Sequence, residues 1–276
     1  MKFDFKINKY YLINHTMQSY NQRQIMPFPE WEKLERRLLK KYDSEPSYYF
    51  LNPKEIYWTM ETIFIDSFLN NKQNFEQTFL KTALRLKKIY EEIIRSQEFK
   101  RLYKETYQYL KFVENQWQKN EKKVFKIIED LSGIKIPQKQ ITIYITHPRL
   151  KNGRMIRDKN IILWGHSEDW KNYSTIYLCH ELMHILTENK YKNPELMHAI
   201  IELLADNELR IRLNKKGNYF KEGKIAIGHE YLKPLEKRIL KYWKQYLEGK
   251  NEKNIFEFEN FLLKKEDITS VIPSLN

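Results

Sequence analysis

Apolar residues recur every three or four positions over most of this chain, and this spacing predicts a predominantly helical protein. The pattern is almost continuous through residues 28–131, where a break is expected near residues 115–120. Gly133 then follows as a helix stop, because glycine favours the position just after a helix. The helices expected from this spacing cover residues 31–42, 54–71, 75–131, 231–249 and 254–265.

A different pattern appears after Gly133. Isoleucines alternate with threonine and tyrosine over residues 141–146, which predicts a half-buried strand. A basic turn containing Asn152 and Gly153 is expected next. A second strand is expected over six residues, namely Asn160, Ile161, Ile162, Leu163, Trp164 and Gly165. The predicted fold is therefore α+β: a small sheet among many helices, divided into a helical N-terminal region (1–131) and a domain that holds the sheet (132–276).

The length and composition narrow the classes of protein. A chain of 276 residues can form one large domain or two small ones. It has no apolar run long enough for a membrane span, and its start has no signal-peptide pattern. Its single cysteine, Cys179, excludes an intramolecular disulfide, and before a helical histidine it is expected to be a small buried residue. These features predict a cytoplasmic protein.

The strongest chemical signal is the pentapeptide His180-Glu181-Leu182-Met183-His184. Apolar residues at helical spacing predict a helix from about Ser174 to Glu188, after a turn that holds N-cap candidates. Residues four apart lie on one face of a helix, so both imidazoles can reach one zinc ion. Glu181 then lies beside the open position of the metal, where it can act as general base.

A third zinc ligand is expected from the next helix, which is predicted to start with Asn193 as N-cap and Pro194 at its first position. Glu202 is the preferred candidate, because a carboxylate among apolar neighbours is costly to bury unless it is paired or bound to metal. Asp206 lies four residues further on, where it can hold the ring of a ligating histidine. His198 is a rival ligand, and a solvated acidic helix face is the structural alternative.

These residues resemble the gluzincin branch of the zincin metallopeptidases, of which thermolysin-like enzymes are the best-known members. The resemblance rests on His180-Glu181-x-x-His184 followed by Glu202-x-x-x-Asp206, within residues 140–213. It implies a zincin-like domain with Zn²⁺ held by His180, His184 and Glu202. It also implies that Glu181 is the base and that Asp206 supports a ligand histidine. The metzincin branch expects a glycine and a third histidine shortly after the first pair, which this chain lacks.

The resemblance carries two weaker expectations. One is an edge strand before the metal helix that pairs with an extended peptide, a place that Asn160–Gly165 takes in sequence order. The other is a donor that stabilises the transition state from a segment after the third ligand. His229 is preferred for this role, with Tyr231 and Tyr219 as alternatives. His166, which directly follows the predicted strand, is expected to be incidental.

The leading hypothesis is a zinc-dependent metallopeptidase that acts on a peptide or protein substrate. One alternative is a non-catalytic zincin-like module that binds a partner peptide or protein. The other is a basic helical nucleic-acid-binding protein with an accidental motif, because the chain carries a net charge of +13. The basic residues are dispersed along the helices and form no known nucleic-acid motif, which disfavours this second alternative.

Overall fold

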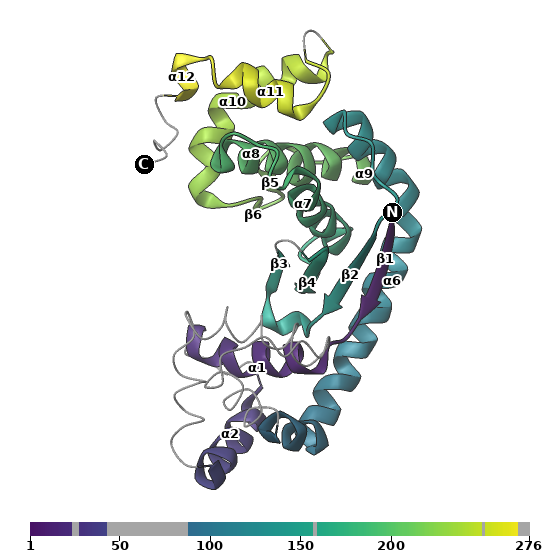
Figure 1. Cartoon of the computed structure of the whole chain (residues 1–276), viewed down its shortest axis with the longest axis vertical. Helices are drawn as coiled ribbons and strands as arrows, with labels where there is room; N and C mark the ends of the chain where they lie inside the picture. The colour runs from purple at the N-terminus through teal and green to yellow at the C-terminus, as the bar shows by residue number, and fades with distance from the viewer. Residues whose placement is uncertain (24–27, 43–87, 157–158, 250–251, 270–276) are drawn as a thin grey trace.

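A computed structural model describes residues 1–23, 28–42, 88–156, 159–249 and 252–269. The expected helix over 54–71 lies outside the described residues, as does the start of the expected segment 75–131. The described part is a mixed α/β structure in which helices predominate around one small mixed sheet, as the sequence predicted (Figure 1).

The sheet has four strands in the order β1-β2-β4-β3. Their bounds are β1 (Lys2–Lys6), β2 (Gln140–Ile145), β3 (Asn152–Ile156) and β4 (Ile161–Gly165). β1, β2 and β4 are parallel, whereas β3 runs antiparallel to β4 and forms one edge. All five residues of β4 are buried, because its alternate side chains pack on both faces of the sheet: Ile162 and Trp164 in the main core, and Ile161 and Leu163 with Tyr11. The two predicted strands, β2 and β4, are therefore confirmed.

Two features of the sheet differ from the sequence prediction. Asn152 and Gly153 do not form a turn but begin β3, where Gly153 pairs with Trp164 of β4. A side chain at Gly153 would collide with the Trp164 ring, since an added Cβ would lie 2.6 Å from it. The segment Asn160–Gly165, expected to be an edge strand, contains the inner strand β4, and the edge strand beside it is β3.

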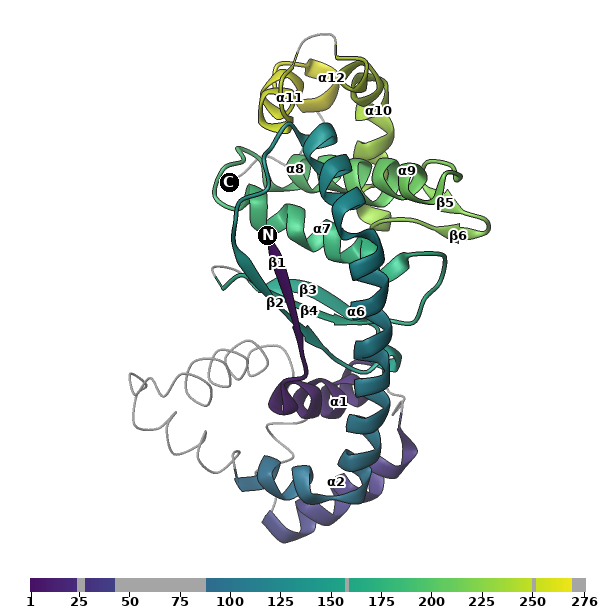
Figure 2. The same cartoon turned by 90° about the vertical axis from the view of Figure 1, so that its right-hand side faces the viewer.

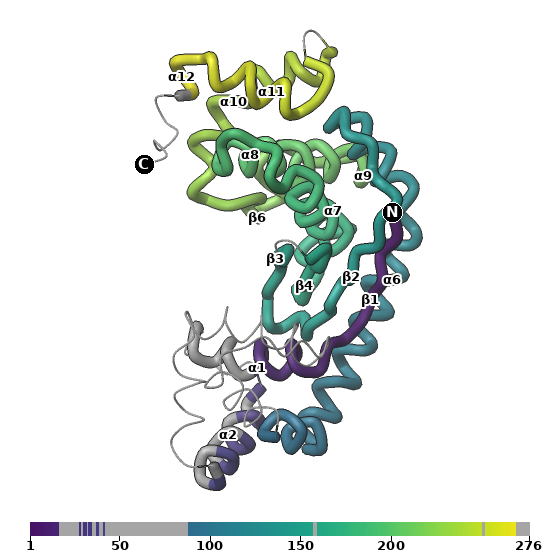
Figure 3. The backbone as a smooth tube through the Cα atoms, in the orientation of Figure 1, coloured from purple at the N-terminus to yellow at the C-terminus, as the bar shows by residue number. Residues whose placement is uncertain are grey.

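The N-terminal strand β1 was not predicted, although it joins the sheet beside β2. Phe3 on this strand is buried and stacks on Trp117, with ring centroids 4.0 Å apart. Figure 3 shows the start of the chain lying alongside the long helix that carries Trp117. The first residues of the chain therefore belong to the sheet and not to a purely helical region.

This long helix, α6 (Gln97–Ser132), runs from the region of α2 (Pro29–Tyr42), past the sheet, to the level of α8 (Pro194–Ile201) (Figure 2). Ser96 caps its start by accepting a hydrogen bond from the Phe99 amide at 3.1 Å. Gly133, at φ 66°, ends it as predicted. The predicted break near residues 115–120 is wrong, because α6 is continuous there and at 36 residues is about 54 Å long. Its buried stripe keeps an unbroken helical period: Leu110, Val113, Trp117, Val124, Ile128 and Leu131.

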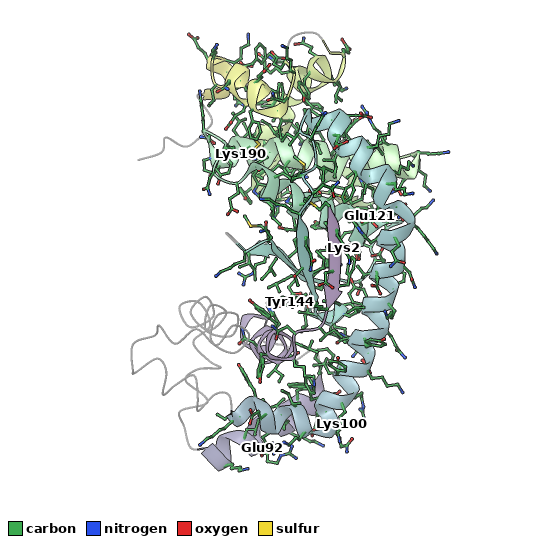
Figure 4. The ribbon with its side chains drawn as sticks, turned by 45° about the vertical axis from the view of Figure 1, so that its right-hand side comes forward. Lys2, Glu92, Lys100, Glu121, Tyr144 and Lys190 are labelled. Carbon is green, nitrogen blue, oxygen red and sulfur yellow. The ribbon has the colours of Figure 1, made fainter. Side chains whose placement is uncertain are left out.

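α6 contributes to two hydrophobic cores. Its first turns, with Phe99 and Leu102, pack with residues of α1 (Lys9–Arg23) and α2 (Pro29–Tyr42). The rest packs with the sheet and the helices that follow it. Tyr144 of β2 lies where the sheet meets α1, with its ring 5.4 Å from that of Tyr11 (Figure 4). The border between the two cores thus falls within α6, upstream of residue 131.

The helices from α7 to α12 lie on the side of the sheet away from α1 and α2 (Figure 1), whereas the short helix η2 packs against α1. α7 packs against β3, β4, α6 and the segment formed by α8, η3 and α9. The bounds of these elements are η2 (Pro148–Leu150), α7 (Tyr173–Thr187), α8 (Pro194–Ile201), η3 (Glu202–Leu209), α9 (Arg210–Asn214), β5 (Lys221–Glu222), β6 (Ile225–Ala226), η4 (Glu230–Leu232), α10 (Lys233–Leu247), α11 (Ile255–Leu262) and α12 (Glu266–Thr269). Among the described helices, none combines the length and apolarity that a bilayer span requires.

Candidate metal centre

The helix that carries the histidine pair, α7, begins at Tyr173 and agrees with the predicted helix. Its start is not capped by the predicted turn, since Asn172 has φ 62° and makes no side-chain cap bond. Glu168 caps it instead: its carboxylate accepts hydrogen bonds from the amides of Tyr173 and Ser174, each at 3.0 Å. A carboxylate there also complements the positive end of the helix dipole. The motif consequently lies in the rigid middle of a well-anchored helix.

His180 and His184 bring their Nε2 atoms to 3.1 Å from each other. A tetrahedral zinc ion with Zn–N bonds of about 2.0–2.1 Å would hold two ligand nitrogens about 3.3 Å apart. The observed spacing therefore fits two imidazoles that share one ion. The second ring nitrogen of His180, Nδ1, donates a hydrogen bond to Asp206 Oδ2 at 3.0 Å. This bond fixes the tautomer of His180 and leaves its Nε2 for a metal.

Burial and charge act in opposite directions on His180. Burial lowers the pKa of its imidazole, but the neighbouring carboxylates, above all Asp206, together raise that pKa to about 9. The site thus attracts positive charge at this imidazole. A proton supplies it when no metal is bound, and a zinc ion would replace that proton.

Glu181 is buried beneath β3, at 8% exposure. Its Oε2 accepts a hydrogen bond of 2.6 Å from the backbone amide of Met155, in the edge strand. Burial raises the pKa of this carboxyl group. A base with a raised pKa takes up a proton more readily near neutral pH, as a general base in hydrolysis must.

The next helical segment starts as predicted, with the Asn193 side chain capping the amide of Leu196 at 2.9 Å and Pro194 in the first turn. Its centre, η3, is a π-helical stretch, which the sequence did not predict. The amide of Arg210 reaches back five residues to the carbonyl of Ala205. Such widened turns are rare and occur frequently at functional sites. This one carries both predicted acidic residues, Glu202 and Asp206.

The structure brings four histidines and Glu202 together, in two overlapping groups that could each hold a metal ion. The inner group, defined here as His180, His184 and His198, has its ligand atoms within 4.8 Å of one another. The outer group, defined as His198, Glu202 and His229, meets the same limit. His198, which the sequence offered only as a rival ligand, belongs to both groups.

Glu202 is fully buried but points towards the loop before α10. Both of its oxygens accept hydrogen bonds from the His229 amide, each at 3.0 Å, and Oε1 also contacts His229 Nδ1. Gly228 makes this close approach possible. An added Cβ there would lie 2.1 Å from Glu202 Oε2, and its φ of 76° is also one that side chains rarely adopt.

Two further charged side chains complete the surroundings of Glu202. Glu236 of α10 is fully buried and lies within hydrogen-bonding distance of the Glu202 carboxylate. No described group donates a hydrogen bond to either of its oxygens. The Lys233 ammonium group is 3.6 Å from Glu236 Oε2. Burial, together with the neighbouring Glu202, raises the pKa of Glu236.

The three candidates for transition-state stabilisation occupy different places. The side chain of His229 is 48% exposed and its ring lies 6.2 Å from that of His180. Tyr231 is 63% exposed, and its hydroxyl lies 3.4 Å from His198 Nδ1. Both therefore border the open side of the centre. Tyr219 lies elsewhere, with its hydroxyl on Glu208 and Trp243.

The other residues singled out in the sequence lie outside both histidine groups. His166 sits against Trp164 and Tyr173, with ring distances of 6.1 and 4.9 Å. Cys179 is buried, as expected, and burial raises the pKa of its thiol. Trp164 of the inner strand donates its indole N–H to Ser174 at 2.9 Å, a contact that joins the sheet to α7.

Sequence reasoning missed Glu236, although a signal was present. Leu235, Ile239 and Trp243 form the buried stripe of α10, and Glu236 falls on that stripe at helical spacing. An acidic residue among core positions predicts a buried partner or ligand. The contact of the Met155 amide with Glu181 could not be predicted, because every residue type except proline has a backbone amide and only the fold determines which amide meets Glu181.

A scan against models of known protein families, a search of curated proteins and a search of solved structures each found no match for this chain.

Proposed function

We propose that the protein is a zinc-dependent peptidase with a zincin-like catalytic domain. The observation that carries this proposal is the pair of His180 and His184 Nε2 atoms, 3.1 Å apart, with Glu181 between them on the same buried helix. A purely structural zinc site has no use for a buried glutamate beside its open position. Zinc, when bound, would lower the pKa of a bound water molecule and polarise the scissile carbonyl.

The chain's own residues supply the remaining functions in this proposal. Glu181 takes the proton of the attacking water and passes it to the leaving amine. The Met155 amide holds the carboxylate of Glu181 in place through its 2.6 Å hydrogen bond. Asp206 holds the ring of His180 in the orientation that metal binding requires. Each role corresponds to a contact within the buried part of the site.

The position of β3 favours a peptide as the substrate. β3 is an edge strand that contacts α7, so a second extended chain can pair with its outer side next to Glu181. Substrate pairing is therefore assigned to β3, residues Asn152–Ile156, instead of the predicted Asn160–Gly165. His229 and Tyr231, on the open side of the centre, are the proposed donors to the developing oxyanion.

The third zinc ligand in this proposal comes from the segment of α8 and η3. Glu202 is the assignment that follows from the resemblance to gluzincins. Its buried carboxylate lies 3.7 Å from His198, which in turn reaches the His180–His184 pair. His198 is the second candidate, because its ring nitrogens already lie within reach of the pair. Both candidates give the three protein ligands that a catalytic zinc site uses.

The proposal is tested with Glu181→Gln in the full chain, with a peptide library as substrate. Glutamine keeps the size of the side chain but cannot accept a proton, so cleavage should fall by at least about a hundredfold, the usual contribution of a general base. Zinc content should stay unchanged. Glu230→Gln is a matched control, because Glu230 is exposed and adjoins His229.

Three results are informative. Loss of cleavage in Glu181→Gln alone, with zinc retained, supports the proposed base. Equal cleavage by the wild type and Glu181→Gln contradicts it. Zinc binding without cleavage of any library peptide by the wild type contradicts the peptidase and favours the non-catalytic module.

A further inference from the structure

We infer that the outer group, His198, Glu202 and His229, forms a second binding site for a divalent transition-metal ion beside the His180–His184 pair. This inference builds on the proposed zinc site but has a separate test. Two imidazoles and one carboxylate are a donor set suited to zinc and similar ions. Their ligand atoms already lie within 4.8 Å of one another.

A second observation points to a cation at this position. Glu236 is fully buried behind Glu202, and within the described part of the chain neither of its oxygens accepts a hydrogen bond. The Nε2 atom of His198 is also buried and has no hydrogen-bond partner among the described groups, although it faces Glu202 Oε1 at 3.7 Å. Buried polar atoms of this kind are normally satisfied, and a metal ion in the outer group would satisfy His198 Nε2.

Acidic side chains gather around the two groups. Four carboxyl groups are buried in or beside them, those of Glu181, Glu202, Asp206 and Glu236. Lys233 is a buried basic residue beside these carboxyl groups. Buried carboxyl groups are normally paired or bound to a metal ion.

Arg210 is a second basic residue near the two groups, but it is engaged with other partners. Its guanidinium forms a buried ion pair with Glu222, and its Nε donates to the backbone carbonyl of Asp206 at 2.8 Å. Lys233 does oppose cation binding, but its ammonium group lies on the far carboxylate, Glu236, at 3.6 Å. His229 is half-exposed, so an ion can reach the outer group from solvent.

The two groups adjoin through His198, which belongs to both. The ring centroids of His180 and His229, one from each group, are 6.2 Å apart, so the two groups are neighbours in space. The second ion would then stand on the open side of the centre, where substrate arrives.

The test measures zinc stoichiometry and affinity. The full chain is freed of metal and titrated with Zn²⁺ against a chromophoric chelator, and bound zinc is counted by mass spectrometry. His229→Ala removes an outer ligand and His184→Ala removes an inner one. His166→Ala is the matched control, because His166 belongs to neither group. Circular dichroism confirms that each variant keeps its helices.

We expect two zinc ions per chain in the wild type and in His166→Ala. We expect one in His229→Ala and one in His184→Ala. Glu236→Gln perturbs the outer group more mildly. It should weaken zinc binding to the outer group by about 10–100-fold, as loss of a residue that supports a ligand does, and leave zinc binding to the inner group unchanged. Retention of two strong sites in both His229→Ala and Glu236→Gln would overturn the inference.

Other outcomes separate this inference from the proposed peptidase. One zinc ion in the wild type that is lost in His184→Ala and kept in His229→Ala overturns the second site but leaves the catalytic site intact. One ion that is lost in His229→Ala and kept in His184→Ala upholds the outer site and contradicts the catalytic one. No bound zinc in the wild type contradicts both.

Discussion

Gly228 provides a sharp test of how the loop before α10 holds Glu202. Gly228 and Gly223 both have left-handed backbones, with φ of 76° and 59°. An alanine at either position suffers the same kind of backbone strain, roughly 1–2 kcal/mol. The surroundings differ: a Cβ at Gly228 would lie 2.1 Å from Glu202 Oε2, whereas a Cβ at Gly223 would have no atom within 4 Å. Gly223→Ala is therefore a control for strain alone.

The additional effect at Gly228 follows from this contact. Real Cβ contacts are essentially never shorter than 3.0 Å, so Glu202 or the loop must move and its hydrogen bonds to the His229 amide must lengthen. Leaving a buried carboxylate without its donors costs roughly 1–3 kcal/mol beyond the strain. Gly228→Ala should accordingly lower the free energy of unfolding by more than Gly223→Ala, by about that amount.

Urea unfolding of both variants, followed by circular dichroism, measures this difference. Zinc titration of the folded proteins adds a second readout. Gly228→Ala should weaken zinc binding, because it displaces Glu202, and Gly223→Ala should leave it unchanged. Equal unfolding free energies and equal zinc affinities in the two variants would refute the role of Gly228.

Three further predictions concern the centre and the core. Asp206→Asn should weaken zinc binding by about 10–100-fold, because it weakens the hydrogen bond that orients the His180 ring. The control Glu208→Gln, on the same helical segment, should leave zinc binding unchanged. Equal zinc affinities of the two variants in a chelator competition would contradict the role of Asp206. Zinc affinity should fall as the pH decreases between roughly pH 8 and 6, because the proton on His180 must leave before the metal binds. Burial lowers the pKa of this imidazole, but the neighbouring carboxylates, above all Asp206, raise it to about 9. A flat profile by titration calorimetry would exclude His180 as a ligand. Trp117→Ala should lower the free energy of unfolding, measured in urea, by about 3–5 kcal/mol, because Trp117 is buried. Phe112 is exposed on the same helix, so Phe112→Ala should change that free energy by less than about 0.5 kcal/mol.

The parts of the fold that the sequence predicted are those set by local patterns. The start of α8 followed from the capping chemistry of Asn193 and the fixed backbone of Pro194. The alternation in residues 141–146 predicted β2 because one face of that strand is buried. β1 was missed because five residues with two phenylalanines form too short a pattern. Its pairing partner, β2, lies more than 130 residues away in the sequence.

In the candidate site too, local sequence patterns predicted some contacts, whereas others depend on segments that are distant in the sequence. The spacing of His180 and His184 predicted their shared face, and the contact between Asp206 and His180 agrees with the predicted support of a ligand histidine. The approach of His229 to Glu202 depends on a turn at Gly228 and on a loop that sequence spacing does not describe. The edge position of β3 depends on strand order, which short-range patterns do not determine.

The π-helical stretch η3 affects how Glu202 and Asp206 are placed. In a regular helix with 3.6 residues per turn, residues 202 and 206 would lie on one face. In the structure the turn is widened, and the side chain of Asn207 donates to the carbonyl of Glu202 at 3.0 Å. Asp206 still faces His180, but Glu202 faces the loop and α10. The widened turn thereby places these two acidic residues on different neighbours.

The most direct test of the proposed zinc site is a crystal structure of the zinc-loaded chain with anomalous diffraction at the zinc edge. We expect an anomalous peak about 2.0–2.1 Å from Nε2 of both His180 and His184, with Glu181 close by but not bound to the ion. A fully zinc-loaded crystal with no peak between these two nitrogen atoms would contradict the proposed catalytic site.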